Sequence, residues 1–427
     1  MNHHPAPTNS KGRVLFASLV GTTIEYYDFY IYGTAAALVF GALFFPNESS
    51  SAQQLSAFAT FAIAFIARPL GSAIFGHFGD RIGRKTSLVA SLLIMGISTT
   101  LIAFLPGYAA MGVIAPLLLC ILRFGQGIGL GGEWAGAALV ATENAPNEKR
   151  GWFGIFPQLG APIGFILANG LFLIMAHFQQ EDAFKAIGWR VPFLFSAILL
   201  GVGLYVRLAL MESPSFIRIM EQNKRIKVPL FTVLKEHSKE LLLGSFGMMI
   251  CYSLFYISTV FALSFGTKTL FIPREQFLAM ECGSILFMAA GILLSGHLAD
   301  LIGRKPVLMA GSVLAIFSGF LLAPAFNSGN LFTIGSFLAL ELFLMGVTFG
   351  PMGALLPELF PASVRYTGAA IAYNMGGILG ASFAPYMAQK LVTEGGLAWV
   401  GAYISATAVI SLLAIFLTTE TRHKEFN

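Results

Sequence analysis

Charged residues are scarce in this chain. Of its 427 residues, Asp, Glu, Lys and Arg make up 11%, whereas hydrophobic residues make up 56% and the mean hydropathy is +0.75. A soluble domain usually carries roughly 25% charged residues, so the polar side chains here are too few to cover a water-soluble globule. The composition predicts an all-α integral membrane protein with no soluble domain of its own, because lipid can solvate its exterior.

Residues that would bind a cofactor or a metal are also few. All three cysteines lie far apart within apolar runs and lack metal-ligand spacing, so we interpret them as small core residues. Gly127-x-Gly129-x-x-Gly132 matches the dinucleotide fingerprint in letters alone, but it lies inside an apolar run with no preceding strand. Glycines four residues apart predict close helix contact there instead. With no clustered nucleophile and no phosphate-binding loop, the sequence predicts neither an enzyme nor a cofactor.

Twelve apolar runs are long enough to cross a membrane as helices, which takes about 20 residues. They lie near residues 14–44, 53–79, 86–105, 109–141, 151–178, 188–210, 240–269, 275–299, 306–326, 331–357, 365–392 and 397–418. The first run is longer than the core of a signal peptide and carries Glu25 and Asp28 in its middle. We therefore expect it to be retained as the first span.

The basic residues divide unevenly between the two sides that these spans define. Of the 26 Lys and Arg residues, 19 lie in the termini and loops of one side, five lie on the other side, and Arg68 and Arg123 lie within spans. The positive-inside rule predicts that both termini are cytoplasmic, in a multi-pass protein of the bacterial inner membrane. The basic stretch 212–239 fits a cytoplasmic linker near anionic lipid better than a nucleic-acid site.

Two motifs recur in the same order in the two halves of the chain. Residues 76–85 (GHFGDRIGRK) return as 296–305 (GHLADLIGRK), and residues 143–150 (ENAPNEKR) are echoed by 358–365 (ELFPASVR). The chain is therefore predicted to be a duplicated six-span unit. Its expected parts are an N-terminal tail (1–13), an N-terminal six-helix bundle (14–211), a cytoplasmic linker (212–239), a C-terminal six-helix bundle (240–419) and a C-terminal tail (420–427).

The Gly-x-x-x-Asp-x-x-Gly-Arg-Lys pattern between spans two and three resembles the signature of the major facilitator superfamily, whose fold joins two parallel six-span halves. More narrowly, residues 23–29 (TIEYYDF), 65–71 (FIARPLG) and 122–134 (LRFGQGIGLGGEW) resemble the metabolite–proton symporters. That family includes shikimate, α-ketoglutarate, citrate and proline/betaine transporters, and residues 32–40 look nearer to the shikimate-type members. The resemblance implies two pseudo-symmetric bundles and proton-coupled uptake of a small organic acid or metabolite by alternating access.

Several ionisable residues fall inside predicted spans, where each charge costs about 2.5–3.5 kcal/mol, so they should face one another or a shared water-filled cavity. Glu25 and Asp28 are three residues apart and share a helix face in span one. Two close carboxylates with little water disfavour double ionisation, so one of them is prone to carry a proton. We predict Glu25 and Asp28 as proton-coupling residues, with Glu133 in span four as another. Ion pairs that only join helices are the alternative.

A buried guanidinium offers a planar fork of donors for a carboxylate. Arg123 in span four is the predicted clamp for the substrate, and Arg68 is either an alternative clamp or a structural partner. Further side chains are predicted to line the central cavity with them: Tyr26 and Tyr30 on span one, Gln158 on span five, Tyr252 and Tyr256 on span seven, and Asn374 on span eleven.

Charged residues of the repeated motifs sit where spans meet the cytoplasm. The resemblance implies that they form a network that closes the cytoplasmic face and breaks when that face opens. Its expected members are Asp80, Arg81, Arg84, Glu143, Arg150, Asp300, Arg304, Glu358 and Arg365.

Other transport functions remain open from the sequence. A zwitterion such as proline or betaine would also use a cation and an acid together. Proton-driven export is a further alternative, although residues 160–164 (GAPIG) only loosely approach the glycine–proline pattern of exporters. A channel rather than a carrier is the third alternative function. The expected partners are a small-molecule substrate, protons and lipid, with the proton gradient as energy source and a monomer as the working unit.

Overall fold

The computed structural model describes the backbone of residues 11–46, 49–82, 84–208 and 229–424, with their side chains except those of residues 11, 13, 14, 76–82, 84–88 and 229. This part of the chain consists of helices joined by short turns, with no strand. Helices satisfy all their backbone hydrogen bonds internally, which is why an apolar chain in lipid adopts them.

The N-terminal half contains α1 (Lys11–Ala35), the π-helix η1 (Ala36–Phe40), α2 (Gly41–Phe44), α3 (Ser50–Ile82), α4 (Arg84–Ile102), α5 (Tyr108–Met111), α6 (Ile114–Leu130), α7 (Glu133–Glu143), the 3₁₀-helix η2 (Asn147–Lys149), α8 (Arg150–Phe178), α9 (Glu181–Ala183), the π-helix η3 (Phe184–Gly188) and α10 (Arg190–Leu208). Several of these are consecutive segments of one rod: α1, η1 and α2 form the first span, and α6 and α7 form the fourth.

The C-terminal half contains α12 (Pro229–Glu236), α13 (Ser238–Tyr256), the π-helix η4 (Ile257–Phe261), α14 (Ala262–Lys268), α15 (Arg274–Ile302), α16 (Arg304–Asn327), α17 (Leu331–Phe349), α18 (Met352–Leu359), α19 (Arg365–Gly377), the π-helix η5 (Ile378–Ser382), α20 (Ala384–Gly395) and α21 (Leu397–Leu417). The expected linker lies mostly outside the described residues, and α12 is the part of it that the structure shows.

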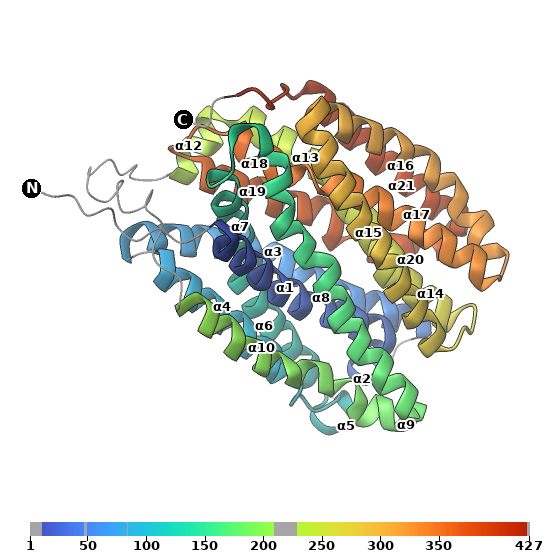
Figure 1. The fold of residues 1–427 in the computed structure, drawn as a ribbon. Helices are drawn as coiled ribbons and strands as arrows, with labels where there is room; N and C mark the ends of the chain where they lie inside the picture. Colours follow the sequence, from blue (N-terminus) through green and yellow to red (C-terminus); the bar gives the residue numbers. More distant parts are fainter. Residues whose placement is uncertain (1–10, 47–48, 83, 209–228, 425–427) are drawn as a thin grey trace, which may run out of the picture.

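Ten rods in the described part of the chain are long and apolar enough to cross a membrane. The other two predicted spans are also helical. In α4 only Val89–Ile102 counts as a shorter apolar helix, and the rod from α19 to α20 is less apolar because it buries polar side chains such as Asn374 and Ser382. The structure thus confirms an all-α membrane fold of two six-helix bundles, drawn in blue to green and in yellow to red in Figure 1.

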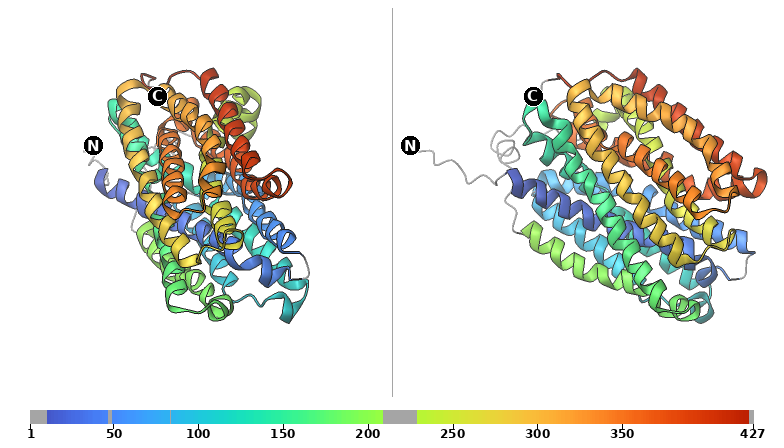
Figure 2. Two further views of the ribbon diagram at one scale, coloured as in Figure 1. Left: turned by 90° about the vertical axis from the view of Figure 1, so that its right-hand side faces the viewer. Right: turned by 45° about the vertical axis from the view of Figure 1, so that its right-hand side comes forward.

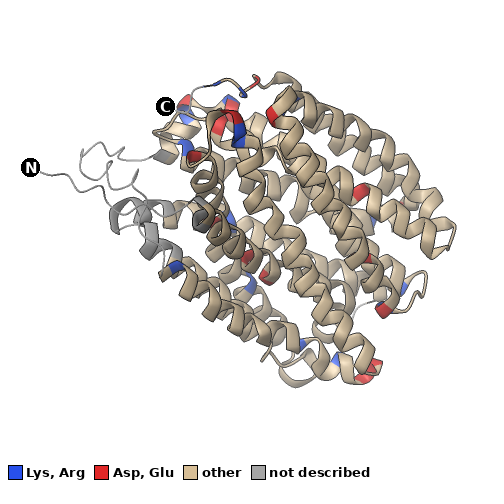
Figure 3. Ribbon diagram, viewed as in Figure 1, with Lys and Arg blue, Asp and Glu red and all other residues tan. Residues whose placement is uncertain are grey.

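The long helices of both bundles run in roughly one direction, and α8 of the first bundle lies along α15 of the second (Figures 1 and 2). We call the end at which α1 begins and α21 ends the terminal end. The opposite end, with α2, α5, α9 and the turn between α14 and α15, is the distal end. Charged residues gather at the terminal end, whereas the middle stretches of the helices carry few (Figure 3).

Glycines let α6 approach α3 closely, as the four-residue spacing predicted. A Cβ atom at Gly127 would collide with the backbone carbonyl of Ala64, and one at Gly131 with the carbonyl of Arg68. Gly129 faces α4 instead, where a Cβ would lie 2.8 Å from the Met95 Cβ atom. These contacts confirm that the glycine-rich run serves helix packing.

Candidate functional site

Aromatic side chains form the contact between the two bundles midway along α1. The phenol oxygens of Tyr26 (α1) and Tyr373 (α19) are 2.8 Å apart. The Tyr373 ring stacks on Trp134 (α7), with ring centroids 3.9 Å apart and ring planes 5° apart. All three side chains are buried, so they join the two halves directly.

The predicted tyrosines lie in the same region. Tyr26 stacks on Tyr30 with a centroid distance of 5.6 Å, and Tyr252 stacks on Tyr256 at 6.3 Å. Tyr30 also stacks on Phe255 of the other half at 4.8 Å. The structure therefore brings both tyrosine pairs together across the interface. We call the following six side chains the aromatic layer: Tyr26, Tyr30, Trp134, Tyr252, Tyr256 and Tyr373.

The two predicted amide side chains border this layer. Gln158 accepts a hydrogen bond from Trp134 Nε1 at 2.8 Å and donates to the Phe349 carbonyl at 2.9 Å. Asn374 donates through Nδ2 to the Gly131 carbonyl at 2.9 Å. Each amide thus connects one half to the other.

Arg68 (α3) lies beside the aromatic layer. Its guanidinium carbon is 4.4 Å from the ring centroid of Phe29, and its Nε has no hydrogen-bond partner among the described residues. Glu25 is within electrostatic range. The neighbouring titratable groups of the other half are Tyr252, Tyr256 and Tyr373. Arg68 is therefore a buried cation at the interface of the two halves.

Arg123 (α6) lies over the ring of the same phenylalanine and is fully buried. Its guanidinium carbon is 4.3 Å from the Phe29 centroid and 3.9 Å from that of Tyr32. Nη1 donates to Gln126, whereas Nε and Nη2 have no partner among the described residues. The sequence favoured Arg123 as the clamp. Arg68, its alternative, has three tyrosines of the C-terminal half within electrostatic range, whereas among the described residues Tyr256 is the one within range of Arg123.

Glu133, the first residue of α7, forms an ion pair with Arg207. Its Oε1 lies 2.6 Å from Arg207 Nη1 and accepts a hydrogen bond from Ser91 at 3.0 Å. Glu25 lies within electrostatic range of Glu133, Arg68 and Arg207, and its Oε2 has no hydrogen-bond partner among the described residues. The sequence placed Arg207 among the loop residues, but its side chain is only 12% exposed and reaches back into the bundle.

Asp28 faces the interior of the N-terminal bundle. Its Oδ1 accepts a hydrogen bond from Ser196 (α10) at 2.6 Å. Glu133 is within electrostatic range of both Asp28 and Glu25, so the two predicted carboxyls share a third acidic neighbour. Side chains three residues apart leave a helix about 60° apart, which is enough to give them different neighbours.

Asp300 at the terminal end of α15 binds the other bundle. Its two carboxylate oxygens accept hydrogen bonds from the backbone N–H groups of Gly151 and Trp152, both at 2.8 Å. These groups belong to the first turn of α8, where N–H groups have no acceptor within the helix. A carboxylate of one half therefore caps a helix of the other half.

Arg304 and Glu358 form a buried pair beside this cap. Arg304 Nε and Nη2 lie 3.2 Å from different oxygens of Glu358, and Nη1 lies 3.3 Å from Asp300. Arg150 of the N-terminal half is 3.8 Å from Glu358. These four residues, Arg150, Asp300, Arg304 and Glu358, form a cluster that we call the terminal charge cluster.

The remaining predicted gate residues are placed only in part. Arg365 donates to the Phe360 carbonyl at 3.3 Å and has Glu143 and Glu358 within electrostatic range. The side chains of Asp80, Arg81 and Arg84, which make up the N-terminal copy of the motif, lie outside the described residues.

Sequence reasoning missed several residues of the interface. Tyr373 directly precedes the predicted Asn374, and Trp134 directly follows the predicted Glu133. Extending the prediction by one residue at each of these sites would have included both. Glu281 on α15 and Glu341 on α17 are buried carboxyls in the middle of apolar runs. The argument that selected Glu25, that an ionisable residue inside a membrane span is costly and therefore has a function or a partner, applies equally to them.

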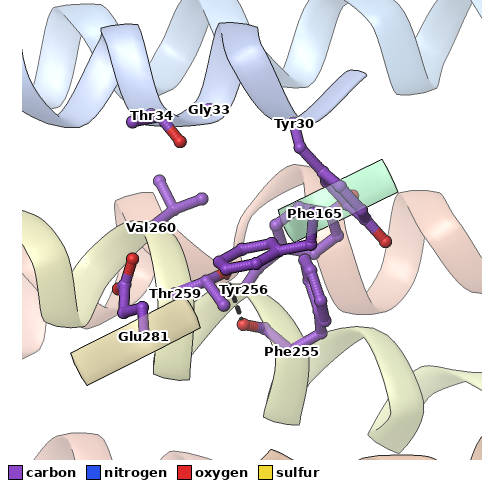
Figure 4. A pocket seen from close by; sticks show the side chains of 9 residues that line it. All are labelled: Tyr30, Gly33, Thr34, Phe165, Phe255, Tyr256, Thr259, Val260 and Glu281. Carbon is purple, nitrogen blue, oxygen red and sulfur yellow. Dashed lines mark hydrogen bonds between the residues drawn. The ribbon is translucent and has the colours of Figure 1, made fainter. Parts of the chain in front are cut away.

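A small cavity lies between the halves, distal to the aromatic layer (Figure 4). Its volume is about 10 Å³, which is room for about one water molecule. It is lined by Tyr30, Gly33, Thr34, Phe165, Phe255, Tyr256, Thr259, Val260 and Glu281. Aromatic rings thus fill the centre, where the sequence predicted a water-filled cavity. The ionisable residues Glu25, Asp28 and Arg123 are nevertheless at most 2% exposed, so they face protein rather than lipid.

Two bundles of six helices, with buried ionisable groups at and beside their interface, define a carrier-type membrane protein. Comparison with protein families agrees: residues 14–239 match the family described as "Sugar (and other) transporter", and residues 276–427 match "Major Facilitator Superfamily". The chain belongs to the major facilitator superfamily, and it is a transporter rather than an enzyme.

Its relatives are metabolite transport proteins. The chain is 53% identical to the inner membrane metabolite transport protein YhjE of Escherichia coli strain K12, covering 98% of this chain and 96% of the relative. It is 35% identical to the shikimate transporter of the same strain, over 96% and 95% of the two chains. The proton:xylose symporter XylE has the same fold, with a TM-score of 0.78 at 19% identity over 97% of each chain.

Proposed function

We propose that this protein takes up a small organic acid together with a proton, by alternating access, across the bacterial inner membrane. The terminal end, which carries both chain termini, faces the cytoplasm in this proposal, in line with the positive-inside rule. The proton gradient is the energy source, no cofactor takes part, and the working unit is a monomer. The relatives named as an inner membrane protein and as a shikimate transporter support the membrane and the substrate class.

One observation carries the substrate class. Arg68 and Arg123 both lie over the ring of Phe29, and three of their buried nitrogen atoms have no hydrogen-bond partner among the described residues. A carboxylate supplies the acceptors and the negative charge that such donors need. Arg68 is the first ligand in this proposal because it lies between the halves, and Arg123 is the second.

The aromatic layer supplies the rest of the substrate site. Its tyrosines come from both halves, so a substrate bound among them contacts both bundles at once. Their rings suit the apolar face of a small carbon skeleton, and the hydroxyl groups suit its polar substituents. Gln158 and Asn374 would then exchange their present partners for the substrate or keep the halves in register around it.

Asp28 is the first candidate for carrying the coupled proton. Among the described residues its hydrogen bonds come from the hydroxyl groups of Ser196 and Thr99 rather than from a cation, so a buried negative charge there is poorly compensated. Glu25 and Glu133 belong to a network with Arg68 and Arg207, which links the proton sites to the substrate clamp.

Asp28→Asn tests this assignment. In proteoliposomes with an imposed proton gradient, wild-type protein should accumulate at least one labelled acid from a panel of shikimate, dicarboxylates, citrate and aromatic acids. The variant should lose accumulation while still exchanging internal for external substrate, because it mimics the protonated carboxyl. Lys390→Gln, at the distal end, is the matched control and should behave as wild type. Unchanged accumulation by Asp28→Asn contradicts its role as proton carrier.

A zwitterionic osmolyte is the second candidate substrate. Glu25 and Arg68 place an acid and a cation within range of each other, which suits a molecule with both charges. A related glycine betaine, proline, ectoine and pipecolic acid transporter, OusA of Dickeya dadantii, is 34% identical over 96% of this chain. Betaine and proline added to the same panel decide between the two, since the organic acid proposal expects neither to compete with the preferred acid.

A further inference from the structure

Glu281 is a buried carboxyl that the proposed mechanism leaves unused. It lies on α15, is 1% exposed, and its Oε1 has no hydrogen-bond partner among the described residues. Its side chain forms part of the wall of the small cavity between the halves, across from Thr34 of α1 and beside Thr259 and Val260 of η4 (Figure 4). The cavity touches both bundles on the distal side of the aromatic layer.

Among the described residues, none that lines the cavity with this carboxyl compensates a negative charge. The titratable side chains that line the cavity with it are Tyr30 of α1 and Tyr256 of α13, and the other described lining residues carry no charge. Elements packed against α15 do hold ionisable groups, but the basic ones have other partners, and Arg150 of α8 and Arg304 of α16 belong to the terminal charge cluster. Lys268 of α14 binds Gln54, His177 of α8 binds Glu275, and Glu341 of α17 lies beside Ser318. On α15 itself the adjacent Cys282 is a free thiol.

We propose that Glu281 is a second proton-binding site, which permits the distal end to close only when it is protonated. This inference rests on the proposed proton-coupled transport. When the halves part at the distal end, water reaches the carboxylate, which takes a proton from hydronium and leaves one water molecule. The neutral acid then fits the closed cavity, which has room for about one water to bridge it to Thr34 or Thr259. An ionised Glu281 opposes closure because no cation accompanies it.

The test measures closure of the distal end against pH without any substrate. Spin labels are placed at Phe178→Cys on α8 and Phe332→Cys on α17, two distal positions that are 78% and 82% exposed, after the native cysteines are replaced by alanine. In lipid nanodiscs, double electron–electron resonance should show a shift to shorter distances as pH falls. Glu281→Gln, which mimics the protonated acid, should show the short distance at every pH.

Glu341→Gln is the matched control, since Glu341 is equally buried in the same bundle but is not part of the cavity wall. It should keep the wild-type pH response. Glu281→Asp retains a titratable group and should also keep a pH response, which covers the case in which Glu281→Gln does not fold. A wild-type pH response in Glu281→Gln overturns the inference, as does a pH-independent distance in the wild type or in Glu281→Asp. Failure of every substrate in the uptake assay, with the pH-driven closure intact, would reject the proposed substrate class and leave Glu281 as a proton site.

Discussion

At the scale of single residues, the main feature of the interface is a pair of buried guanidinium groups, Arg68 and Arg123. They have more N–H donors than there are acceptors to bind them among the described residues. Leaving a buried donor without a partner costs about 1–3 kcal/mol, and a desolvated cation over an aromatic face regains about 2 kcal/mol. Rings therefore hold Arg68 and Arg123 in place in the closed state, while their free N–H groups remain suited to an anion. Such a site favours a ligand that brings two acceptor oxygens in one plane.

Arg68→Lys should raise the KM for the transported acid at least about tenfold, equivalent to about 1.4 kcal/mol of binding free energy. Lysine keeps the charge but loses the planar fork. Initial uptake rates in proteoliposomes measure the effect. Arg123→Lys should change KM less, and Arg422→Lys, near the C-terminus, should not change it. An unaltered KM in Arg68→Lys would remove the proposed clamp.

At the scale of whole elements, helix ends and glycine contacts decide how the rods can move. The α8 N-terminus is stabilised by a carboxylate from the other bundle, so this cap exists only while the terminal end is closed. Glycine contacts between α3, α4 and α6 lie within one bundle instead, and should persist in every state. Removing the cap should therefore favour opening of the terminal end, whereas disturbing the glycine contacts should lower the stability of the bundle in every state.

Asp300→Ala should open the terminal end. It removes two hydrogen bonds to the first turn of α8 and one ion pair to Arg304, together worth about 1–3 kcal/mol. A cysteine introduced at the buried Ala354, which faces α8, should then react faster with a polar maleimide. Asp182→Ala at the distal end is the control. Equal labelling rates in wild type and Asp300→Ala would show that the cap does not hold the end closed.

Gly129→Ala should lower the stability of the N-terminal bundle without favouring the opening of either the terminal or the distal end. Its new Cβ would lie 2.8 Å from atoms of Met95 and Ser91 on α4, and such overpacking costs about 1–3 kcal/mol. Gly129→Leu should prevent folding. Gly170→Ala, whose Cβ meets nothing within 4 Å, is the control. Fluorescence-detected size-exclusion chromatography measures the melting temperatures of Gly129→Ala and Gly170→Ala. Equal melting temperatures for these two variants would contradict the packing argument.

At the scale of the whole molecule, the structure is occluded, with contacts between the bundles at both ends. The terminal charge cluster joins them at one end, and His177 with Glu275, 2.8 Å apart, joins them at the other. Single exposed pairs such as the latter contribute about 0–1 kcal/mol, so this pair opposes opening of the distal end only weakly. A carrier needs this balance, because its outward-open and inward-open states must both be reachable.

Larger side chains at two glycines should open opposite ends. A Cβ at Gly353 collides with the Gly154 carbonyl in the terminal contact, whereas a Cβ at Gly33 lies 3.0 Å from Val260 in the distal contact. Gly353→Leu should lengthen spin-label distances across the terminal end only, and Gly33→Leu those across the distal end only. Lengthening at both ends in either variant would argue against two bundles that rock as units.

The sequence by itself determined the membrane class, the twelve helical spans and the duplication, because hydrophobic length and repeated motifs are local properties of the chain. It also identified five buried ionisable residues (Glu25, Asp28, Arg68, Arg123 and Glu133) and both tyrosine pairs, since a charged residue or a repeated aromatic residue is conspicuous inside an apolar run. Tertiary structure alone decided that Arg68 has more tyrosines of the other half within range than Arg123, that Ser196 binds Asp28, and that Glu281 lines a cavity. These facts depend on which face of each helix meets which neighbour, and that is set by packing between segments far apart in the chain.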